Sequence, residues 1–142
     1  MTIAEIEDRL PAGFHDAKLL SVAIDYEKSQ AEIEFDLWTP TDEEIETYAR
    51  AKLTLSELQY FIIEPPAMNE VLNVAEHDLS SVDGFVTAGF PGHAESIPQT
   101  IAGKFAHSLF VFNWNSSIHL AAGSAELEPT SLIEEREAAD QV

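Results

Sequence analysis

The chain has 142 residues, which fits one domain with a hydrophobic core of its own. It has no cysteine, which excludes disulfide bonds, thiol catalysis and thiolate metal sites. Its 26 acidic and 7 basic residues give a formal charge of −19, which disfavours nucleic acid and anionic membranes as partners and would attract a basic protein or cations. This charge fits either a solvated acidic surface of a soluble bacterial-type protein or a surface shaped for a basic partner. The start lacks a signal-peptide pattern and no apolar run is long enough to span a membrane, so we expect a cytoplasmic protein.

A short helix is expected first, at residues 2–9. Thr2 is a suitable N-cap and Glu5 stands at capping-box distance from it. Ile3 and Ile6 have helical spacing, so they would form the buried side of this helix. A proline and a glycine shortly afterwards would end it.

The strongest pattern is a two-stranded hairpin between Phe14 and Trp38, with a polar loop at residues 27–30. Apolar residues fall two apart in both halves, which places each set on one face of a strand. The other face of the second strand is acidic, so this sheet should have one buried face and one face in water. The residues expected in the core are Leu20, Val22, Ile24 and Tyr26 in the first strand and Ile33, Phe35 and Leu37 in the second.

Residues 47–55 alternate again and predict a third strand, after an acidic, solvated connection at residues 39–46. The polar face of this strand carries Arg50 and Lys52. If it pairs with the second strand, both bases lie across from the acidic face Glu32–Asp36 and form cross-strand ion pairs.

The sequence of residues 56–103 does not predict a single secondary structure. Residues 56–64 fit a helix capped by a serine or a strand that a Pro-Pro pair stops. The first part of residues 67–92 fits either a helix or a strand with a turn. Turns near residues 80–84 and a short strand or loop are expected after it. Residues 93–103 are expected to form a polar surface loop.

A second strong β signal runs from Phe105 to Trp114 and is apolar on both faces, which is typical of a central strand covered on both sides. A turn at residues 113–117 and a returning strand follow, and residues 121–128 are expected to form an edge strand. The acidic segment 129–142 is expected to be partly helical or frayed.

These elements predict a mostly antiparallel β fold, all-β or α+β, with about six to eight strands and one or two short helices. A curved sheet, a sandwich and a partly open barrel all fit this pattern. The sequence has no internal repeat and no domain boundary, so residues 1–142 should form a single domain.

The sequence has no motif for nucleophilic catalysis, phosphate binding or dinucleotide binding, so we expect neither catalytic residues nor a cofactor. Its five histidines lack the close spacing of a zinc site, so a metal would need ligands from distant segments, and we expect none. His107 and His119 stand among apolar residues, and we expect both to be sheet histidines that bond to the backbone.

Two turns combine polar and aromatic residues, and turns carry function more often than strands do. At the first, His15 and Asp16 precede the first strand, either as a pair that locks the turn or as a functional His–carboxylate pair. The second follows the Phe105–Trp114 strand. The candidate binding surface therefore comprises His15, Asp16, Asn113, Trp114, Asn115 and His119.

The run Leu10–Ala17, which contains Phe-His-Asp-Ala, and the amphipathic stretch Leu19–Tyr26 behind it resemble a group of small uncharacterised bacterial domains. Some members of that group are similar to immunity proteins of bacterial toxin systems. The match covers about the first forty residues, with a weaker echo at Phe112–Ser116. The resemblance implies a small β-rich domain without an established activity, and the immunity analogy implies that the acidic surface would cap a cationic toxin.

Three functions are compatible with these observations. The first is a non-enzymatic binding module that docks a basic protein partner. The alternative is a small-molecule-binding or hydrolase-like β domain with a cleft lined by His15, Asp16, Trp114 and His119. The third is a structural or assembly role, in which an exposed strand edge or an apolar patch makes an oligomer.

The hairpin pattern gives a direct test of the register. Phe35→Asp places a charge in the core and should unfold the protein, whereas Glu34→Lys, at the neighbouring outward position, should leave it folded. Thermal melts followed by circular dichroism check both variants. A stably folded Phe35→Asp protein would show that the strand faces the opposite way.

Overall fold

The computed structural model describes residues 1–39, 47–66, 81–87 and 105–133 of the chain. These residues form the short helix α1 (Ile3–Arg9), eight strands and two 3-10 turns. The strands and turns are, in chain order, β1 (His15–Asp25), β2 (Gln30–Trp38), β3 (Tyr48–Ser56), β4 (Tyr60–Ile63), β5 (Ser81–Thr87), β6 (Phe105–Val111), η2 (Phe112–Trp114), β7 (Ser116–Ala122), β8 (Ser124–Glu128) and η3 (Thr130–Leu132).

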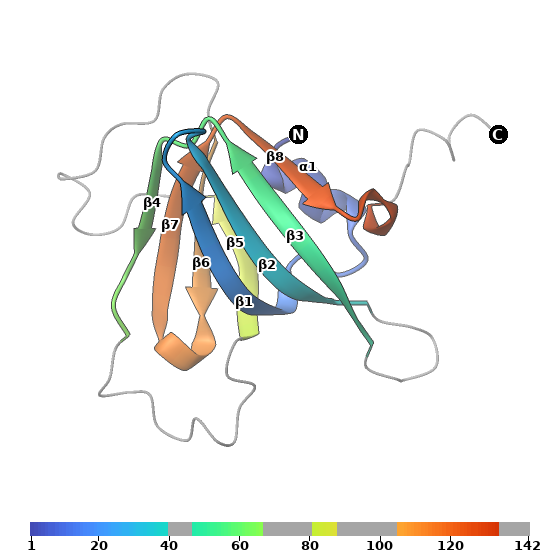
Figure 1. Cartoon of the computed structure of the whole chain (residues 1–142). Coiled ribbons are helices and arrows are strands. Elements are labelled where there is room, and N and C mark those ends of the chain that lie inside the picture. Colours follow the sequence, from blue (N-terminus) through green and yellow to red (C-terminus); the bar gives the residue numbers. More distant parts are fainter. Residues whose placement is uncertain (40–46, 67–80, 88–104, 134–142) are drawn as a thin grey trace.

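The strands follow one continuous hydrogen-bonded order, β4-β7-β6-β5-β1-β2-β3-β8, and all the pairings are antiparallel. The order bends between β5 and β1, so that the β4-β7-β6-β5 half lies behind the β1-β2-β3-β8 half (Figure 1). The predicted mostly antiparallel β fold with one or two short helices is therefore confirmed. In the described part of the chain, the order ends at β4 and β8 without closing into a barrel.

Helix α1 is the one that the sequence predicts. The hydroxyl of Thr2 accepts a hydrogen bond from the backbone N–H of Glu5 at 3.1 Å, and Ile3 and Ile6 are fully buried. The carbonyl of Met1 accepts a hydrogen bond from a β8 amide, so the start of the chain is tied to that end of the sheet.

Strands β1, β2 and β3 form the predicted meander. The register places Asp36 opposite Arg50 and Glu34 opposite Lys52. The Arg50 Nε lies 2.8 Å from the Asp36 carboxylate, and the Lys52 Nζ lies 3.9 Å from that of Glu32. Both bases therefore face the acids of β2, as predicted, and offset part of the repulsion on the outer face of the sheet.

The core face predicted for the first strand is partly wrong. The pairing of β1 with β2 slips between Leu19 and Ser21, because Leu20 is an extra residue in a β-bulge. Leu19 and Val22 pack against the core. The other residues that were expected inside are instead exposed: Leu20 by 40%, Ile24 by 38% and Tyr26 by 89%.

Two segments that the sequence left open are strands. Within residues 56–64, β4 pairs with β7, and residues 81–87 form β5 even though they contain Asp83-Gly84, a sequence typical of turns. The register of β5 with β6 shifts between Val82 and Phe85, and Gly84 has φ +93°, which glycine adopts without strain. The expectations for residues 40–46, 67–80, 88–103 and 134–142 lie outside the described residues.

The second β signal forms β6, which lies between β5 and β7 as predicted for a central strand. The strand stops at Val111, however, and η2 carries Phe112 and Trp114 to the surface. The expected cover on both faces is therefore wrong beyond Val111. Strand β8 is an edge of the sheet, as predicted, and η3 follows it.

In the described residues, no helix is both long and apolar enough to cross a membrane.

The core is centred on three phenylalanines at the bend of the sheet. The ring of Phe14 lies 5.1 Å from that of Phe35 and 5.0 Å from that of Phe85, measured between ring centroids. Phe14 precedes β1, Phe35 lies on β2 and Phe85 on β5, so this cluster joins both halves of the sheet. Such aromatic contacts contribute about 0.5–1.5 kcal/mol per pair beyond the burial of their surface.

Helix α1 places the carboxylate of Glu7 at the same bend. Its Oε2 atom accepts a hydrogen bond from the Phe14 N–H at 3.5 Å. The same oxygen lies 3.1 Å and 3.6 Å from the positions that a Cβ atom would take at Gly13 and Gly84. Burial raises the pKa of Glu7 above its ordinary value, against the lowering effect of hydrogen bonds from the amides of Phe14 and Phe85.

The raised pKa of Glu7 predicts a pH-dependent stability. Its contribution is fully present below the ordinary pKa of a glutamate and is lost as the pH rises through the higher pKa of the folded state. Glu7→Gln keeps a hydrogen-bond acceptor but removes the charge. The free energy of unfolding of this variant, relative to wild type, should therefore increase between about pH 4 and about pH 7.

Urea unfolding of both proteins at several pH values measures this difference. Glu5→Gln, which removes an exposed carboxylate from the same helix, is the control for the change in net charge. A difference between Glu7→Gln and wild type that does not change with pH would contradict the prediction.

Candidate functional site

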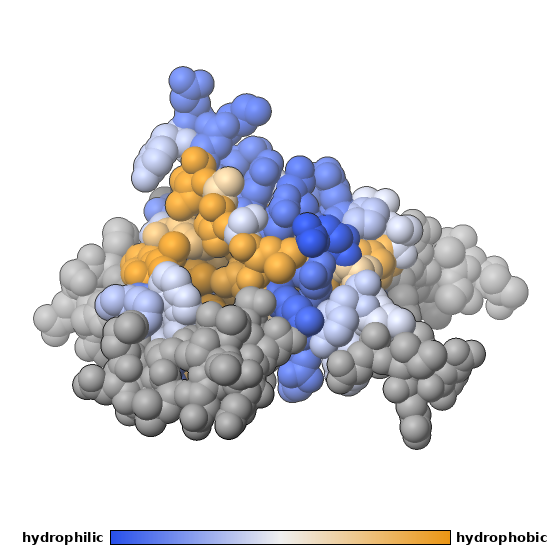
Figure 2. Space-filling view, turned by 60° about the horizontal axis from the view of Figure 1, so that its bottom comes forward, coloured by the Kyte–Doolittle hydropathy of each residue, from blue (hydrophilic) through white to orange (hydrophobic). Residues whose placement is uncertain are grey.

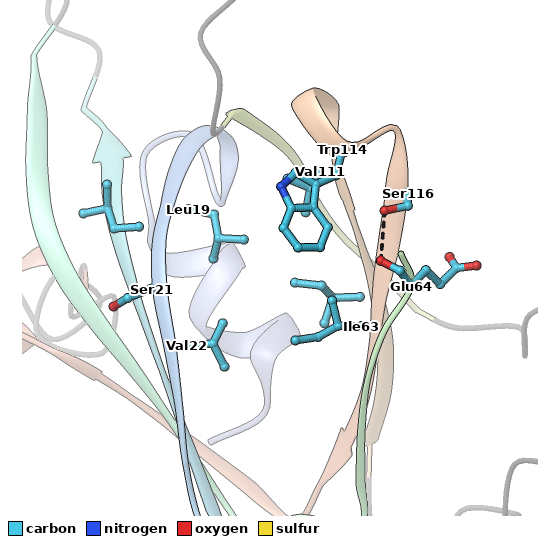
Figure 3. A pocket seen from close by; sticks show the side chains of 10 residues that line it. Leu19, Ser21, Val22, Ile63, Glu64, Val111, Trp114 and Ser116 are labelled. Atoms are coloured by element: carbon cyan, nitrogen blue, oxygen red, sulfur yellow. Dashed lines mark hydrogen bonds between the residues drawn. The ribbon is translucent and has the colours of Figure 1, made fainter. Parts of the chain in front are cut away.

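An apolar cleft of about 210 Å³ opens between β1 and the pair β4–β7, with η2 at one end (Figure 3). Its walls come from segments that are far apart in the sequence, and most of its side chains are aliphatic or aromatic. The residues that line it are Leu19, Leu20, Ser21, Val22, Ile63, Glu64, Val111, Trp114, Ser116 and Ile118.

The cleft exists because β1 changes its neighbours along its length. Its first half pairs with β5, through His15 opposite Asp83 and Lys18 opposite Ser81. Beyond Lys18, the second half pairs only with β2 among the described strands. The other edge of this second half therefore faces β4 and β7 across open space, and the bulge at Leu20 lies where the space begins.

Apolar side chains meet across this space. Leu19 and Val22 point from β1 toward Ile63 of β4 and the indole ring of Trp114 (Figure 3). Leu20, Ile63 and Trp114 remain exposed by 40, 47 and 40%. Figure 2 shows hydrophobic residues gathered into one area on this side of the molecule, next to hydrophilic ones. A mostly apolar cleft of this kind is a candidate site for an apolar group of a ligand or partner.

The turn that holds Trp114 is closed by Asn115. The N–H of Asn115 donates a hydrogen bond to the Phe112 carbonyl at 3.1 Å. Asn115 itself has φ 48° and ψ 41°, the left-handed conformation that asparagine tolerates better than most residues. The polar turn predicted from the sequence therefore has a local physical reason, and it positions Trp114 beside the cleft.

The β4 wall is fixed by hydrogen bonds of Glu64, the residue after the strand. Its N–H donates to the Ser117 carbonyl at 3.1 Å, and its carbonyl accepts from the Ser116 hydroxyl at 3.3 Å. The carboxylate of Glu64 points away from the cleft (Figure 3). It accepts hydrogen bonds from the Ser117 N–H at 3.1 Å and from Nε2 of His119 at 3.0 Å.

The volume of the cleft limits what it can hold. Pockets for drug-sized ligands occupy roughly 300–1,000 Å³. A cavity of about 150 Å³ is enough to bind benzene. At about 210 Å³, the cleft fits one aromatic ring or one branched aliphatic side chain and is too small for a nucleotide cofactor.

His15 and Asp16 lie at the other end of β1 and do not line the cleft. The Nδ1 atom of His15 is 3.0 Å from the Asp16 carboxylate, and both side chains are about half exposed. Asp16 has φ +59°, and the amide of Ala17 donates a hydrogen bond to the Phe14 carbonyl. This geometry agrees with the interpretation of the pair as one that locks the turn.

His119 is buried on β7, but its expected bond to the backbone is wrong. It neighbours Ile118, which lines the cleft, so its side chain lies on the opposite face of the strand. Its ring instead bonds to two side chains, Glu64 at 3.0 Å and Ser108 at 2.8 Å. No sequence signal marks Glu64 as a partner of His119, because it lies 55 residues away along the chain.

The structure therefore does not bring the six predicted surface residues together. Trp114 lines the cleft, Asn115 closes the turn beside it, and Asn113 belongs to η2. His119 lies on the opposite face of β7, and the His15–Asp16 pair stands apart. Within the residues that the structure describes, no three His, Asp or Glu side chains are placed to hold a metal ion.

Comparison with known proteins adds no functional information. No family model matches the chain, and no curated protein matches it. A crystal structure of an uncharacterised protein from Neisseria gonorrhoeae is similar, with a TM-score of 0.43 and 12% sequence identity. The alignment covers 81% of this chain and 92% of that chain.

The cleft predicts weak binding of a single apolar ring. Toluene, the analogue of a phenylalanine side chain, should shift the NMR signal of the Trp114 indole N–H in a saturable way. Ile63→Glu places a charge at the cleft wall and should abolish the shift, because burying that charge costs more than the ring gains. Ile24→Glu, on the exposed end of β1 outside the cleft lining, should not. Equal responses of both variants would contradict binding in the cleft.

Proposed function

We propose that the chain is a binding module that docks a basic protein partner and seats one apolar side chain of that partner in the cleft between β1 and β4–β7. The observation that carries this proposal is an exposed apolar cleft, sized for one side chain, on a chain with a formal charge of −19.

The apolar part supplies the anchor. Leu20, Ile63 and Trp114 leave apolar surface in water, and a partner side chain between them would cover it. Full burial of one large apolar side chain contributes about 1.5–3 kcal/mol. A single aromatic or aliphatic anchor in a desolvated pocket is the usual centre of a protein interface.

The charge supplies the choice of partner. In the described meander, Arg50 and Lys52 are paired with acids of β2. The net charge of −19 is therefore carried by acidic residues other than the partners of these two bases. A basic partner would be attracted over a distance of about one Debye length, roughly 10 Å at 0.1 M salt, and acidic proteins would be repelled. The same field disfavours nucleic acid, whose phosphates carry the same sign of charge.

The two contributions act on different steps of binding. Electrostatic attraction raises the rate of association and depends on salt, whereas the anchor in the cleft governs the rate of dissociation. This division separates specific docking from general adsorption of basic proteins, because adsorption needs no cleft.

A pair of matched variants tests the proposal. Leu20→Glu and Ile24→Glu change the charge equally on one strand, at residues that are 40 and 38% exposed, but only Leu20 lines the cleft. Tagged protein is exposed to lysate of its own source at low and at high salt, and captured proteins are identified by mass spectrometry. We expect one basic partner, held at low salt by wild type and Ile24→Glu and lost with Leu20→Glu. Calorimetry with the purified partner should then show a weakening of tenfold or more for Leu20→Glu.

Capture that is unaffected by Leu20→Glu would show that the cleft is not the docking site. Binding of a small apolar molecule in the cleft without any protein partner would favour the alternative function, a small-molecule-binding domain.

A further inference from the structure

A second polar constellation lies on the face of β7 that is turned away from the cleft. The register places His119 of β7 opposite Ser108 of β6 on one side and opposite Ile62 of β4 on the other. Glu64 follows Ile62 by two residues and reaches the same face. Ser108 of β6, His119 of β7 and Glu64, the residue after β4, therefore form a single hydrogen-bonded chain, Glu64–His119–Ser108.

The direction of the protons in this chain follows from the groups themselves. An ionised carboxylate only accepts hydrogen bonds, so Nε2 of His119 must donate to Glu64. In a neutral imidazole the other nitrogen, Nδ1, is then an acceptor. When His119 is neutral, the hydroxyl of Ser108, 2.8 Å away, therefore donates to Nδ1. The acid thus fixes the histidine in the form that can take a proton from the serine.

Glu64 is held in place independently of His119. Its carboxylate accepts a hydrogen bond from the Ser117 amide, and its backbone bonds to the Ser117 carbonyl and the Ser116 hydroxyl. His119 is 6% exposed, so its ring is packed as well as bonded. Both the base and the group that orients it are therefore preorganised.

The distances match those of an activated nucleophile. Nucleophile and base lie within about 2.6–3.2 Å in such sites, with the base oriented by a third group. The two ring nitrogens have exchanged their usual roles, since Nδ1 faces the serine and Nε2 faces the acid. Either nitrogen of imidazole can accept a proton, so this exchange does not remove the chemistry.

We propose that Ser108 is an activated nucleophile for acyl transfer from small esters, with His119 as its general base and Glu64 as a positioning residue. The Ser108 oxygen would form a bond to the ester carbonyl carbon while its proton passes to Nδ1 of His119. The bond to the leaving alcohol then breaks, and the alcohol takes that proton. Water, deprotonated by the same nitrogen, cleaves the acyl-serine into a carboxylic acid and free Ser108.

A purely structural role explains less of this geometry. The ladder between β6 and β7 extends over seven residue pairs, from Phe105 opposite Ala122 to Val111 opposite Ser116, without help from the Ser108 hydroxyl. The bond between Glu64 and His119 alone would tie the end of β4 to β7. Ser108 is half-buried rather than fully buried, and access of a small reagent to its oxygen is what the labelling experiment measures.

A fluorophosphonate tests the proposal, because it reacts with activated serines and leaves a stable mass increment. We expect one adduct per chain, located at Ser108 by peptide mass spectrometry, and none in Ser108→Ala. Ser124 of β8 is also a half-buried strand serine, and it serves as the internal reference. Ser124→Ala should leave the labelling unchanged.

Glu64→Gln distinguishes activation from mere accessibility. The amide can still accept the hydrogen bonds of His119 and of the Ser117 amide, but it does not stabilise a charged imidazole. General-base catalysis contributes typically 10²–10⁴-fold, so the labelling rate should fall tenfold or more while the thermal melt shows a folded protein.

Two results would overturn the proposal. One is folded wild-type protein in which Ser108 gains no more label than Ser124. The other is a labelling rate that does not change in folded Glu64→Gln. The wild-type result is decisive even if a variant fails to fold, and neither result bears on docking in the cleft on the other face.

Discussion

The change of neighbours along β1 is the constraint on which the rest of the structure depends. Near its start the strand has β5 on one side and β2 on the other, and the ring of Phe14 fills the bend between them against Phe35 and Phe85. Further along, it pairs only with β2 in the described part of the chain. The aromatic cluster keeps the two halves of the sheet together at one end, and their separation at the other end forms the cleft.

Glu64, at the end of β4, makes contacts on both faces of the β4-β7-β6-β5 half of the sheet. The backbone of Glu64 fixes the cleft wall next to Ile63, while its carboxylate bonds to His119 on the opposite face. A single residue thus supports both the proposed docking cleft and the proposed nucleophile. Because β4 has only four residues and lies at the edge of the sheet, these side-chain bonds supplement a short ladder.

The ion pairs of the meander could be predicted from the sequence, whereas the contact between Glu64 and His119 could not. On the outer face of the meander, Arg50 and Lys52 face acids that local alternation and strand pairing bring together. Those pairs were predictable because neighbouring strands in a meander follow one another in the sequence. The Glu64–His119 contact was not predictable, because β4 and β7 are far apart in the chain and nothing in either segment marks the other as its partner.

The sequence by itself determined the capped helix, the meander with its acidic outer face, the central β6 and the edge strand β8, since all of these follow from spacing within short segments. It also singled out Trp114, through a polar turn that asparagine can close. Tertiary structure decided the rest. The bulge at Leu20 exposed a residue that alternation had placed in the core. Long-range pairing made residues 60–63 the strand β4 and assembled the cleft and the Glu64–His119–Ser108 chain. The local sequence pattern indicates which face of a helix or strand is apolar, whereas a site depends on which strands, distant in the sequence, lie side by side in the fold.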